Sequence, residues 1–356
     1  MAAVTVVIPT YNRAELLRRA IDSVFAQTFS DFELFIADNA SSDGTQEFVA
    51  SIGDPRVYSS RVEQNIGPSA NFTRSLYLGD APYVTMLQDD DLMLPDNLAR
   101  KVALLDEWPS IAVAHAAFCY VDENDDVVKQ YATWTHTRAD IIEPGDLFVR
   151  RCLGAGARIN FSSAVMRRTC ILGERWDPAD GRPSDLGAFM RIARRGDVGY
   201  IDTPLTAIRR HAGSDTVQAG TMVLGEEGGY RPDFEVVRAV QAVKERFLAD
   251  YAADFDDLAA LRRASRRWAR RNLTDVVRRK ATADPSPARV GALLLDAARI
   301  EPTVLASREV VRLAIDLAGT ITSRKLRARA DGLSRPQGRS RGAERRKLEA
   351  GRRNGT

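Results

Sequence analysis

At positions 83 to 91 the chain reads Tyr83-Val84-Thr85-Met86-Leu87-Gln88-Asp89-Asp90-Asp91, a strand-like run that ends in three adjacent carboxylates. Three neighbouring aspartates repel one another, so a fold gains nothing from them unless a cation or a donor-rich ligand lies nearby. Open α/β sheets bind their ligands just past the carboxyl ends of the strands. The run therefore indicates a divalent-metal site that holds a phosphorylated ligand, while a solvated acidic turn remains the alternative.

Upstream of this run the chain alternates between strand and helix patterns. Val4 to Ile8 is a β-branched apolar run typical of a strand buried on both faces, and Pro9-Thr10-Tyr11 ends it. Asn12 is placed to cap the following helix. A second strand, Phe32 to Ala37, ends at Asp38. This alternation predicts parallel strands with helical crossovers, in which Asp38 and the aspartate triplet share the edge that binds nucleotides in such folds.

The rest of the chain predicts three regions. Residues 1–220 are expected to form one α/β domain, whose sheet becomes mixed after the triplet and is flanked by helices. Residues 221–322 read as a helical C-terminal region with apolar stripes. Residues 323–356 are dominated by Arg, Gly, Ser and Ala, and we expect a basic disordered tail.

The composition is that of a globular protein. Of 356 residues, 44% are hydrophobic and 28% are charged. No apolar run approaches the roughly 20 residues of a membrane span, and the N-terminus enters a strand without a signal-peptide core. Three scattered cysteines argue against a disulfide framework. We therefore expect a cytoplasmic protein.

Four motifs follow one another along the chain: Val6-Val7-Ile8-Pro9-Thr10-Tyr11-Asn12-Arg13, Asp38-Asn39-Ala40-Ser41-Ser42-Asp43-Gly44-Thr45, Asn65-Ile66-Gly67 and Asp89-Asp90-Asp91. In this order and spacing they resemble the pattern of glycosyltransferase family 2. The resemblance covers residues 4–215 and implies the GT-A, Rossmann-like fold of nucleotide-diphospho-sugar transferases. It is specific for the fold and much less so for the sugar.

The resemblance also implies roles for the matching residues. Pro9, Thr10 and Tyr11 would wall the base pocket, and Asn12 and Arg13 would begin the next helix. Asp38 would accept from the base, typically a uracil or thymine imide, beside Asn39 where many relatives carry a second acid. The implied donor-nucleotide residues are Pro9, Thr10, Tyr11, Asn12, Arg13, Asp38, Asn65, Asp89 and Asp90.

A metal site is implied by the triplet together with a late histidine motif. Asp91 ranks first as direct ligand, and Asp89 has the alternative of holding the ribose or a metal-bound water. The segment from Arg209 to Ser214 resembles a motif whose histidine, here His211, lies near the diphosphate or the metal. Asp89, Asp91 and His211 are thus the candidate ligands of Mn²⁺ or Mg²⁺. A lone histidine is otherwise more often structural.

The segment from Arg182 to Arg191 resembles the one that carries the family's catalytic base. Relatives often show Glu-Asp where this chain has Ser184-Asp185, so Asp185 is assigned as the base. Asp177 and Asp180 lie nearby, and by pattern alone Asp185 would more often be a helix N-cap. One carboxylate that removes the acceptor's proton opposite the leaving group gives inversion, unlike the two-carboxylate retaining route.

The leading hypothesis is an inverting, metal-dependent glycosyltransferase acting in cell-envelope or polysaccharide synthesis. It would move a sugar from a UDP- or dTDP-type donor to a hydroxyl of a glycan or lipid-linked acceptor. One alternative is a sugar nucleotidyltransferase, which would usually show a Gly-rich basic loop after the first strand, unlike Pro9-Thr10-Tyr11-Asn12-Arg13. The other is a non-catalytic module that binds nucleotide sugars.

Basic residues gather toward the C-terminus. Arginine pairs recur every four residues and predict one broad cationic helix face: Arg262, Arg263, Arg266, Arg267, Arg270 and Arg271. Such a face suits an anionic membrane at the inner, cytoplasmic side, or an acidic lipid-linked acceptor. A solvated face is an equal alternative, and no recognised nucleic-acid motif accompanies the charge. Leu293 to Ile315 reads as a helical hairpin that packs on the domain or forms a homodimer.

Overall fold

The computed structural model describes residues 2–133, 138–156, 159–176, 184–211, 222–224, 230–283, 286–306 and 310. The first part contains β1 (Val4–Thr10), α1 (Ala14–Phe25), β2 (Phe32–Asp38), α2 (Thr45–Ala50), β3 (Val57–Arg61), α3 (Pro68–Ser75), β4 (Tyr83–Met86), β5 (Leu92–Met93) and α4 (Asn97–Glu107). The second part contains β6 (Ile111–Val121), β7 (Val127–Ala132), β8 (Ile141–Glu143), α5 (Gly145–Ala155), the 3₁₀ turn η1 (Phe161–Ser163), β9 (Val165–Arg167), α6 (Arg168–Ile171), α7 (Ser184–Ala193) and β10 (Asp197–Arg209). The third part contains β11 (Met222–Leu224), β12 (Tyr230–Pro232), α9 (Phe234–Asp250), η3 (Ala252–Asp254), α10 (Leu258–Ala283), α11 (Pro287–Ile300) and η4 (Pro302–Ala306).

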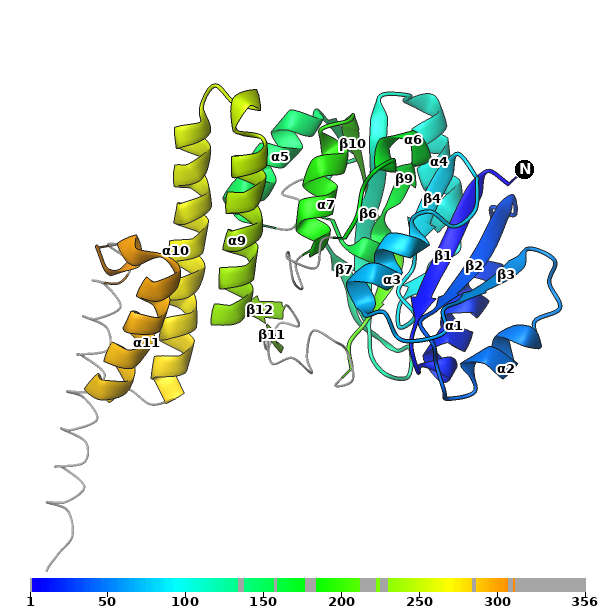
Figure 1. Cartoon of the computed structure of the whole chain (residues 1–356), viewed down its shortest axis with the longest axis horizontal. Helices are drawn as coiled ribbons and strands as arrows, with labels where there is room; N and C mark the ends of the chain where they lie inside the picture. Colours follow the sequence, from blue (N-terminus) through cyan, green and yellow to red (C-terminus); the bar gives the residue numbers. More distant parts are fainter. Residues whose placement is uncertain are drawn as a thin grey trace, which may run out of the picture.

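Ten of the described strands form one mixed sheet in the order β3-β2-β1-β4-β9-β6-β10-β5, with β7 beside β6 and β8 beside β10 (Figure 1). β3, β2, β1 and β4 are mutually parallel, and β9 is antiparallel to both β4 and β6. Because β10 runs parallel to β6, the strands β3, β2, β1, β4, β6 and β10 point the same way and their carboxyl ends meet at one edge, whereas β5, β7, β8 and β9 run in the opposite direction. The predicted mixed sheet flanked by helices is confirmed.

The burial of the central strand β1 explains why its sequence pattern predicted a strand buried on both faces. Every residue of β1 is buried, so the strand carries apolar side chains on both faces, as in Val6, Val7 and Ile8, instead of an alternation of apolar and exposed polar residues. Val6 and Ile8 pack with α1, α2 and α4 on one face, whereas Val7 packs with α5 and α7 on the other. This alternation of sides along one strand is the period of two expected for β structure.

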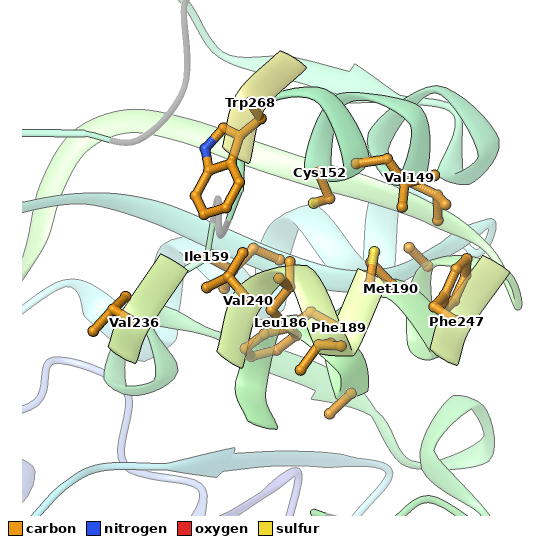
Figure 2. Close-up of a cluster of buried hydrophobic side chains, with 14 of the residues drawn as sticks. Val149, Cys152, Ile159, Leu186, Phe189, Met190, Val236, Val240, Phe247 and Trp268 are labelled. Carbon is orange, nitrogen blue, oxygen red and sulfur yellow. The ribbon is translucent and has the colours of Figure 1, made fainter. Parts of the chain in front are cut away.

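The C-terminal helices α9 and α10 pack on α5 and α7 through the same hydrophobic cluster that covers one face of the sheet (Figure 2). Trp268 of α10 is buried in it, and Lys244 of α9 places its Nζ 3.8 Å from the centre of the Trp268 ring. Gly156 lies so close that an added Cβ would meet Trp268 Nε1 at 3.3 Å. The predicted helical region is thus integrated with the sheet by apolar packing.

Several predictions for the C-terminal part of the chain concern residues that the structure does not describe or describes only in part. The boundary predicted at residue 220 and the tail predicted from residue 323 lie outside the described residues. The hairpin predicted over Leu293 to Ile315 is described only in part: α11 ends at Ile300 and packs on α10 and α9. No helix in the described part of the chain combines the length and the apolar character that a bilayer span requires.

Candidate functional site

Four strand ends bring polar side chains into one row along the carboxyl edge of the sheet. Thr10, Asp38 and Arg61 pair in register at the ends of β1, β2 and β3. Thr10 Oγ1 then donates to Asp89 Oδ2 at 2.8 Å, which joins β1 to the loop after β4. Asp38 and the aspartate triplet therefore share an edge, as the alternation of strands and helices predicted.

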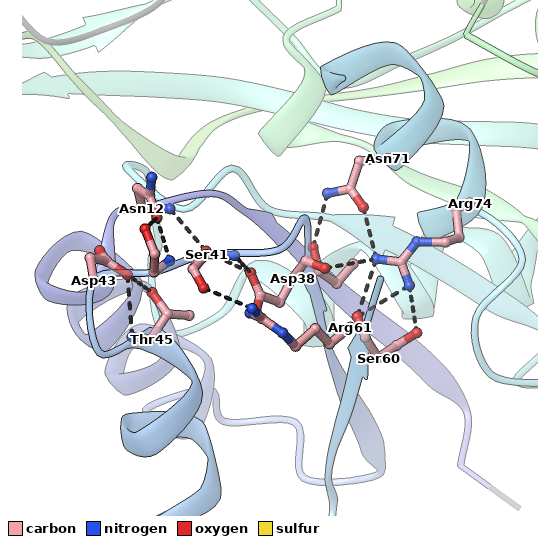
Figure 3. A network of polar contacts seen from close by, with 11 residues as sticks. Asn12, Asp38, Ser41, Asp43, Thr45, Ser60, Arg61, Asn71 and Arg74 are labelled. Atoms are coloured by element: carbon pink, nitrogen blue, oxygen red, sulfur yellow. Dashed lines mark hydrogen bonds and ion pairs between the residues drawn. The ribbon is translucent and has the colours of Figure 1, made fainter. Parts of the chain in front are cut away.

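Asp38 is held as a buried acceptor. Its Oδ1 accepts from the Ser41 backbone N–H at 2.9 Å and from Ser41 Oγ at 2.6 Å, and its Oδ2 accepts from Arg61 (Figure 3). Behind it, Arg74 Nη1 donates to the Ser60 carbonyl at 3.1 Å. A carboxylate offers roughly four lone-pair sites, so Asp38 retains acceptor capacity beside a guanidinium donor. This pairing of acceptor and donor suits the polar edge of a nucleobase.

The loop after β1 differs from the prediction. Asn12, predicted to cap α1, lies before the helix in the left-handed conformation, with φ of 54°. Its Oδ1 accepts from the Ser42 backbone N–H at 2.7 Å instead. Asp43 supplies the cap: it accepts from the Ala14 N–H at 2.9 Å and from the Thr45 N–H at 3.2 Å (Figure 3). A contact across 29 residues thus replaces the local cap, because Asn12 is committed to the neighbouring loop.

The side chains of Asn39 and Asn65 bond to each other, and the Asn39 backbone N–H donates to the Thr10 carbonyl at 3.0 Å. Asn39 Nδ2 donates to Asn65 Oδ1 at 2.9 Å, and Asn39 Oδ1 accepts from the Ile66 N–H at 2.9 Å. Asn65 Oδ1 also accepts from the Gly67 N–H at 2.8 Å. These bonds fix the loop that leads into α3. The role of Asn65 in donor binding stays a prediction.

The three carboxylates of the triplet are all buried; Asp89 and Asp90 share Arg13 as a partner, whereas Asp91 bonds elsewhere. Asp89 accepts from Arg13 Nη1 at 3.1 Å in addition to Thr10. Asp90 lies 3.2 Å from Arg13 Nη1 and 3.1 Å from His211 Nε2. Asp91 accepts from Ser162 Oγ at 2.6 Å and from the Arg209 backbone N–H at 3.0 Å. The triplet, Arg13 and His211 are therefore brought together, as predicted for the sheet edge.

Ser162 and Arg209 are site residues that the sequence did not single out. Ser162 Oγ donates to Asp91 and accepts from the Gln88 N–H at 3.1 Å, so it bridges both ends of the triplet loop. The Arg209 guanidinium donates to the Asp90 carbonyl at 2.9 Å and to the Asp122 carbonyl at 2.7 Å. Arg209 had one signal, its place two residues before His211. Ser162 had no local signal.

The electrostatics of the triplet favour a cation. Burial, followed by the charge of Asp90, raises the pKa of Asp89 to about 7 and that of Asp91 to about 8. Within the described ranges, no three His, Cys, Asp or Glu side chains are grouped as a metal site would require. Mg²⁺ and Mn²⁺ take part of their ligands from water and phosphate, so one or two carboxylates suffice. Carboxylate oxygens with one imidazole fit such an ion.

Asp185 lies in the first turn of α7, which leads through residues 194–196 into the start of β10 (Figure 1). Because helix and strand run in opposite directions, this turn lies toward the carboxyl edge of the sheet. Asp185 Oδ1 accepts from the Leu186 N–H at 2.8 Å, and burial raises its pKa to about 6. Asp177 and Asp180, the alternative bases, lie outside the described residues.

A mixed α/β sheet with a row of polar strand ends and a carboxylate cluster on one edge is an arrangement shared with GT-A glycosyltransferases. Residues 5–164, a little under half of the chain, match the family model described as Glycosyl transferase family 2, and this stretch resembles that family. The crystal structure of S. aureus TarS 1-349 in complex with UDP-GlcNAc superimposes with a TM-score of 0.51 at 17% identity. That match covers 85% of this chain and 90% of the other, and it supports the fold.

Two relatives extend the comparison. The chain is 29% identical over 222 residues to abequosyltransferase RfbV of Salmonella typhimurium, a match covering 57% of this chain and 65% of that protein. It is 30% identical over 136 residues to a GalNAc(5)-diNAcBac-PP-undecaprenol beta-1,3-glucosyltransferase of Campylobacter jejuni, covering 37% of this chain and 43% of that one. The chain thus spans less than two thirds of either relative.

Proposed function

We propose that the chain is an inverting, metal-dependent glycosyltransferase that moves a sugar from a UDP- or dTDP-type donor to an acceptor hydroxyl. One observation carries the proposal: the row from Arg61 and Asp38 through Thr10 to Asp89 is continuous across three strand ends. An acceptor for a base at one end and carboxylates for a metal-bound diphosphate at the other suit one extended ligand, a nucleoside diphosphate sugar.

In this proposal Asp89 and Asp91 would hold Mn²⁺ or Mg²⁺ with His211 as the third ligand. Within the described residues these three side chains are not preassembled as a cluster, so they would draw together as the ion binds. Ser162 would keep Asp91 oriented. When bound, such an ion acts as a Lewis acid for the charge that develops on the leaving diphosphate. His211 supports the assignment because its Nε2 reaches the cluster at Asp90, one residue from each proposed carboxylate ligand.

The base in this proposal is Asp185. The acceptor O–H gives its proton to the Asp185 carboxylate as the oxygen bonds to the anomeric carbon, and the bond from that carbon to the diphosphate oxygen breaks. The diphosphate leaves with the electron pair, so one displacement inverts the anomeric centre. A pKa of about 6 leaves Asp185 ionised at neutral pH yet more basic than an ordinary aspartate.

The PP-undecaprenol in the name of the Campylobacter jejuni relative supports a lipid-linked acceptor, and relatives named for succinoglycan and colanic acid biosynthesis support polysaccharide synthesis. The outward face of α10 supports membrane contact, because the arginines exposed on it include Arg262, Arg263, Arg266, Arg267 and Arg271. A basic residue near an anionic surface contributes roughly 1 kcal/mol. We therefore propose peripheral binding to the cytoplasmic face. The double variant Arg263→Glu, Arg267→Glu should co-sediment less with phosphatidylglycerol vesicles than the wild-type protein does. If the wild-type protein bound phosphatidylcholine vesicles as well as phosphatidylglycerol vesicles, the proposed membrane contact would be wrong.

The proposed function is tested by thermal-shift measurements with UDP, dTDP, GDP and CDP, each with and without Mn²⁺. Stabilisation by a nucleoside diphosphate that requires the metal is expected, followed by transfer from the corresponding nucleotide sugar to give the inverted anomer. Release of pyrophosphate from a nucleoside triphosphate would establish the nucleotidyltransferase instead. Donor binding with neither hydrolysis nor transfer would establish a binding module.

A further inference from the structure

Trp176 is a buried side chain that packs between the turn η1 and the helix α7. It is 1% exposed. Its ring meets the ring of Phe161 of η1 with 5.0 Å between the centroids, and the ring of Phe189 of α7 with 6.5 Å, both edge to face. Edge-to-face contact is one of the two arrangements that aromatic pairs prefer. The tryptophan therefore favours one mutual orientation of η1 and α7.

Both phenylalanines lie next to residues of the site. Phe161 directly precedes Ser162, whose Oγ donates to Asp91 Oδ2 at 2.6 Å. Phe189 lies four residues after Asp185, about one turn further along α7. The distance between the triplet and the proposed base therefore depends on the ring that separates η1 from α7.

The backbone around Trp176 is anchored on two sides. The carboxylate of Glu174 is buried and pairs with Arg191 of α7 at 2.8 Å and with Arg195, just after α7, at 2.9 Å. On the other side, the Trp176 N–H donates to Thr73 Oγ1 of α3 at 2.9 Å. Charge-assisted pairs of this length are among the stronger polar contacts in proteins. Three elements, α3, η1 and α7, thus meet at this tryptophan.

We propose that Trp176 is a positioning residue, which holds the first turn of α7, and with it the Asp185 carboxylate, at a fixed place relative to the triplet. This inference rests on the proposed function, in which Asp185 is the base and the triplet holds the metal. A displacement of about 1 Å at a reacting group can cost roughly 10²-fold in rate. An aromatic contact between η1 and α7 limits such a displacement, although the tryptophan itself touches no reacting atom.

A buried tryptophan also stabilises a core, and the chain offers a matched case for that simpler role. Trp268 belongs to the same hydrophobic cluster and is 7% exposed, but it packs on Gly156 and Lys244. If both rings only filled the core, Trp176→Leu and Trp268→Leu would lower the melting temperature and have the same effect on Asp185. A positioning role predicts that only the first substitution changes the surroundings of Asp185.

The pKa of Asp185 reports this difference without a nucleotide or an acceptor. Burial raises it to about 6. In Trp176→Leu the first turn of α7 is no longer held against η1 and water reaches the carboxylate, so the pKa should fall toward the ordinary value of about 4. It is measured by ¹³C NMR of protein labelled at aspartate Cγ, in which the signal lost in Asp185→Asn identifies the residue.

Trp176→Phe and Trp268→Leu are the controls. Trp176→Phe keeps an aromatic ring between η1 and α7, and Trp268→Leu leaves that contact intact, so both should keep the pKa of Asp185 near 6. UDP affinity at saturating Mn²⁺, measured by calorimetry, should stay near the wild-type value in all three variants. If Trp176→Leu does not fold, Thr73→Val replaces it: it removes only the hydroxyl that holds the Trp176 N–H, and should lower the pKa by a smaller amount.

Two results would overturn the inference: an unchanged pKa of Asp185 in the folded test variant, or an equal fall in Trp268→Leu. Either would mean that Trp176 only fills the core. The proposed function fails on other results, namely no binding of UDP, dTDP, GDP or CDP with Mn²⁺, or normal transfer by Asp185→Asn. Because the pKa comparison involves neither nucleotide nor transfer, the two failures are distinguishable.

Discussion

The carboxyl edge of the sheet and the C-terminal helices are stabilised by opposite kinds of contact. At the edge, buried polar groups bond between loops far apart in sequence, as Asp91 does with Ser162 and Arg209. In α9 and α10 the contacts are apolar, around Phe247 and Trp268. Hydrogen bonds fix direction, whereas apolar packing contributes free energy in proportion to buried area. Changes at the edge should therefore affect ligands, and changes in the helices should affect the stability of the fold.

The largest effect is expected at Asp185. Asp185→Asn retains the shape but cannot accept the acceptor's proton, so kcat should fall by roughly 10²–10⁴-fold. Donor binding and melting temperature should stay near the wild-type values. Single-turnover transfer and calorimetry with UDP measure the two quantities. Near-normal transfer would show that the base lies elsewhere, with Asp177 and Asp180 next to be tested.

The opposite outcome is expected in the helices. Trp268→Ala removes a buried ring that packs on Gly156 and Lys244, and should lower the free energy of unfolding by roughly 3–5 kcal/mol. UDP affinity of the folded protein should not change. Denaturant titration measures the loss, and Trp108→Ala is the control because that ring is exposed and should cost at most roughly 0.5 kcal/mol. If Trp268→Ala lowered the affinity for UDP without lowering the free energy of unfolding, the proposed difference between the sheet edge and the C-terminal helices would be wrong.

The pH dependence of kcat tests the role of Asp185 as the base at the carboxyl edge of the sheet. Burial raises the pKa of Asp185 to about 6, so the carboxylate is protonated, and inactive as a base, below that pH. At saturating donor, acceptor and Mn²⁺, with the bound ion keeping Asp89 and Asp91 ionised, kcat should be level above pH 6 and fall about tenfold for each pH unit below it. If kcat instead began to fall only near pH 4, the ordinary range for the pKa of an aspartate, the group acting as base would be a solvated carboxylate.

The smallest effect is expected behind the triplet. Ser162→Ala leaves a buried oxygen of Asp91 without its hydroxyl donor and should raise the KM for the donor by roughly tenfold, as for one hydrogen bond to a charged group. Ser163→Ala is the matched control: it is buried in the same turn, but its hydroxyl donates to the Asn160 carbonyl. Equal kinetic effects of the two substitutions would indicate that the turn matters only for folding.

Sequence reasoning reached the fold and the groups on the sheet edge because both are encoded locally. Val6, Val7 and Ile8 of β1 are apolar in succession, Asp38 ends β2, and Asp89 lies three residues after the end of β4. Ser162 was missed because its partner Asp91 is 71 positions away and nothing in its neighbourhood marks it. Asn12 was assigned a local cap, but a hydrogen bond to the next loop competes with it. Pairings between distant segments depend on the assembled sheet and cannot be read from one segment.

The double cap made by Asp43 constrains how this edge can change. One carboxylate begins both α1 and α2, so the loops after β1 and β2 form a single unit. Lengthening either loop would separate Asp43 from one of the two helices and expose a backbone N–H that it now satisfies. We therefore expect evolution or design to alter base preference in this chain by exchanging side chains such as Arg61 within loops of constant length, and not by inserting residues into them.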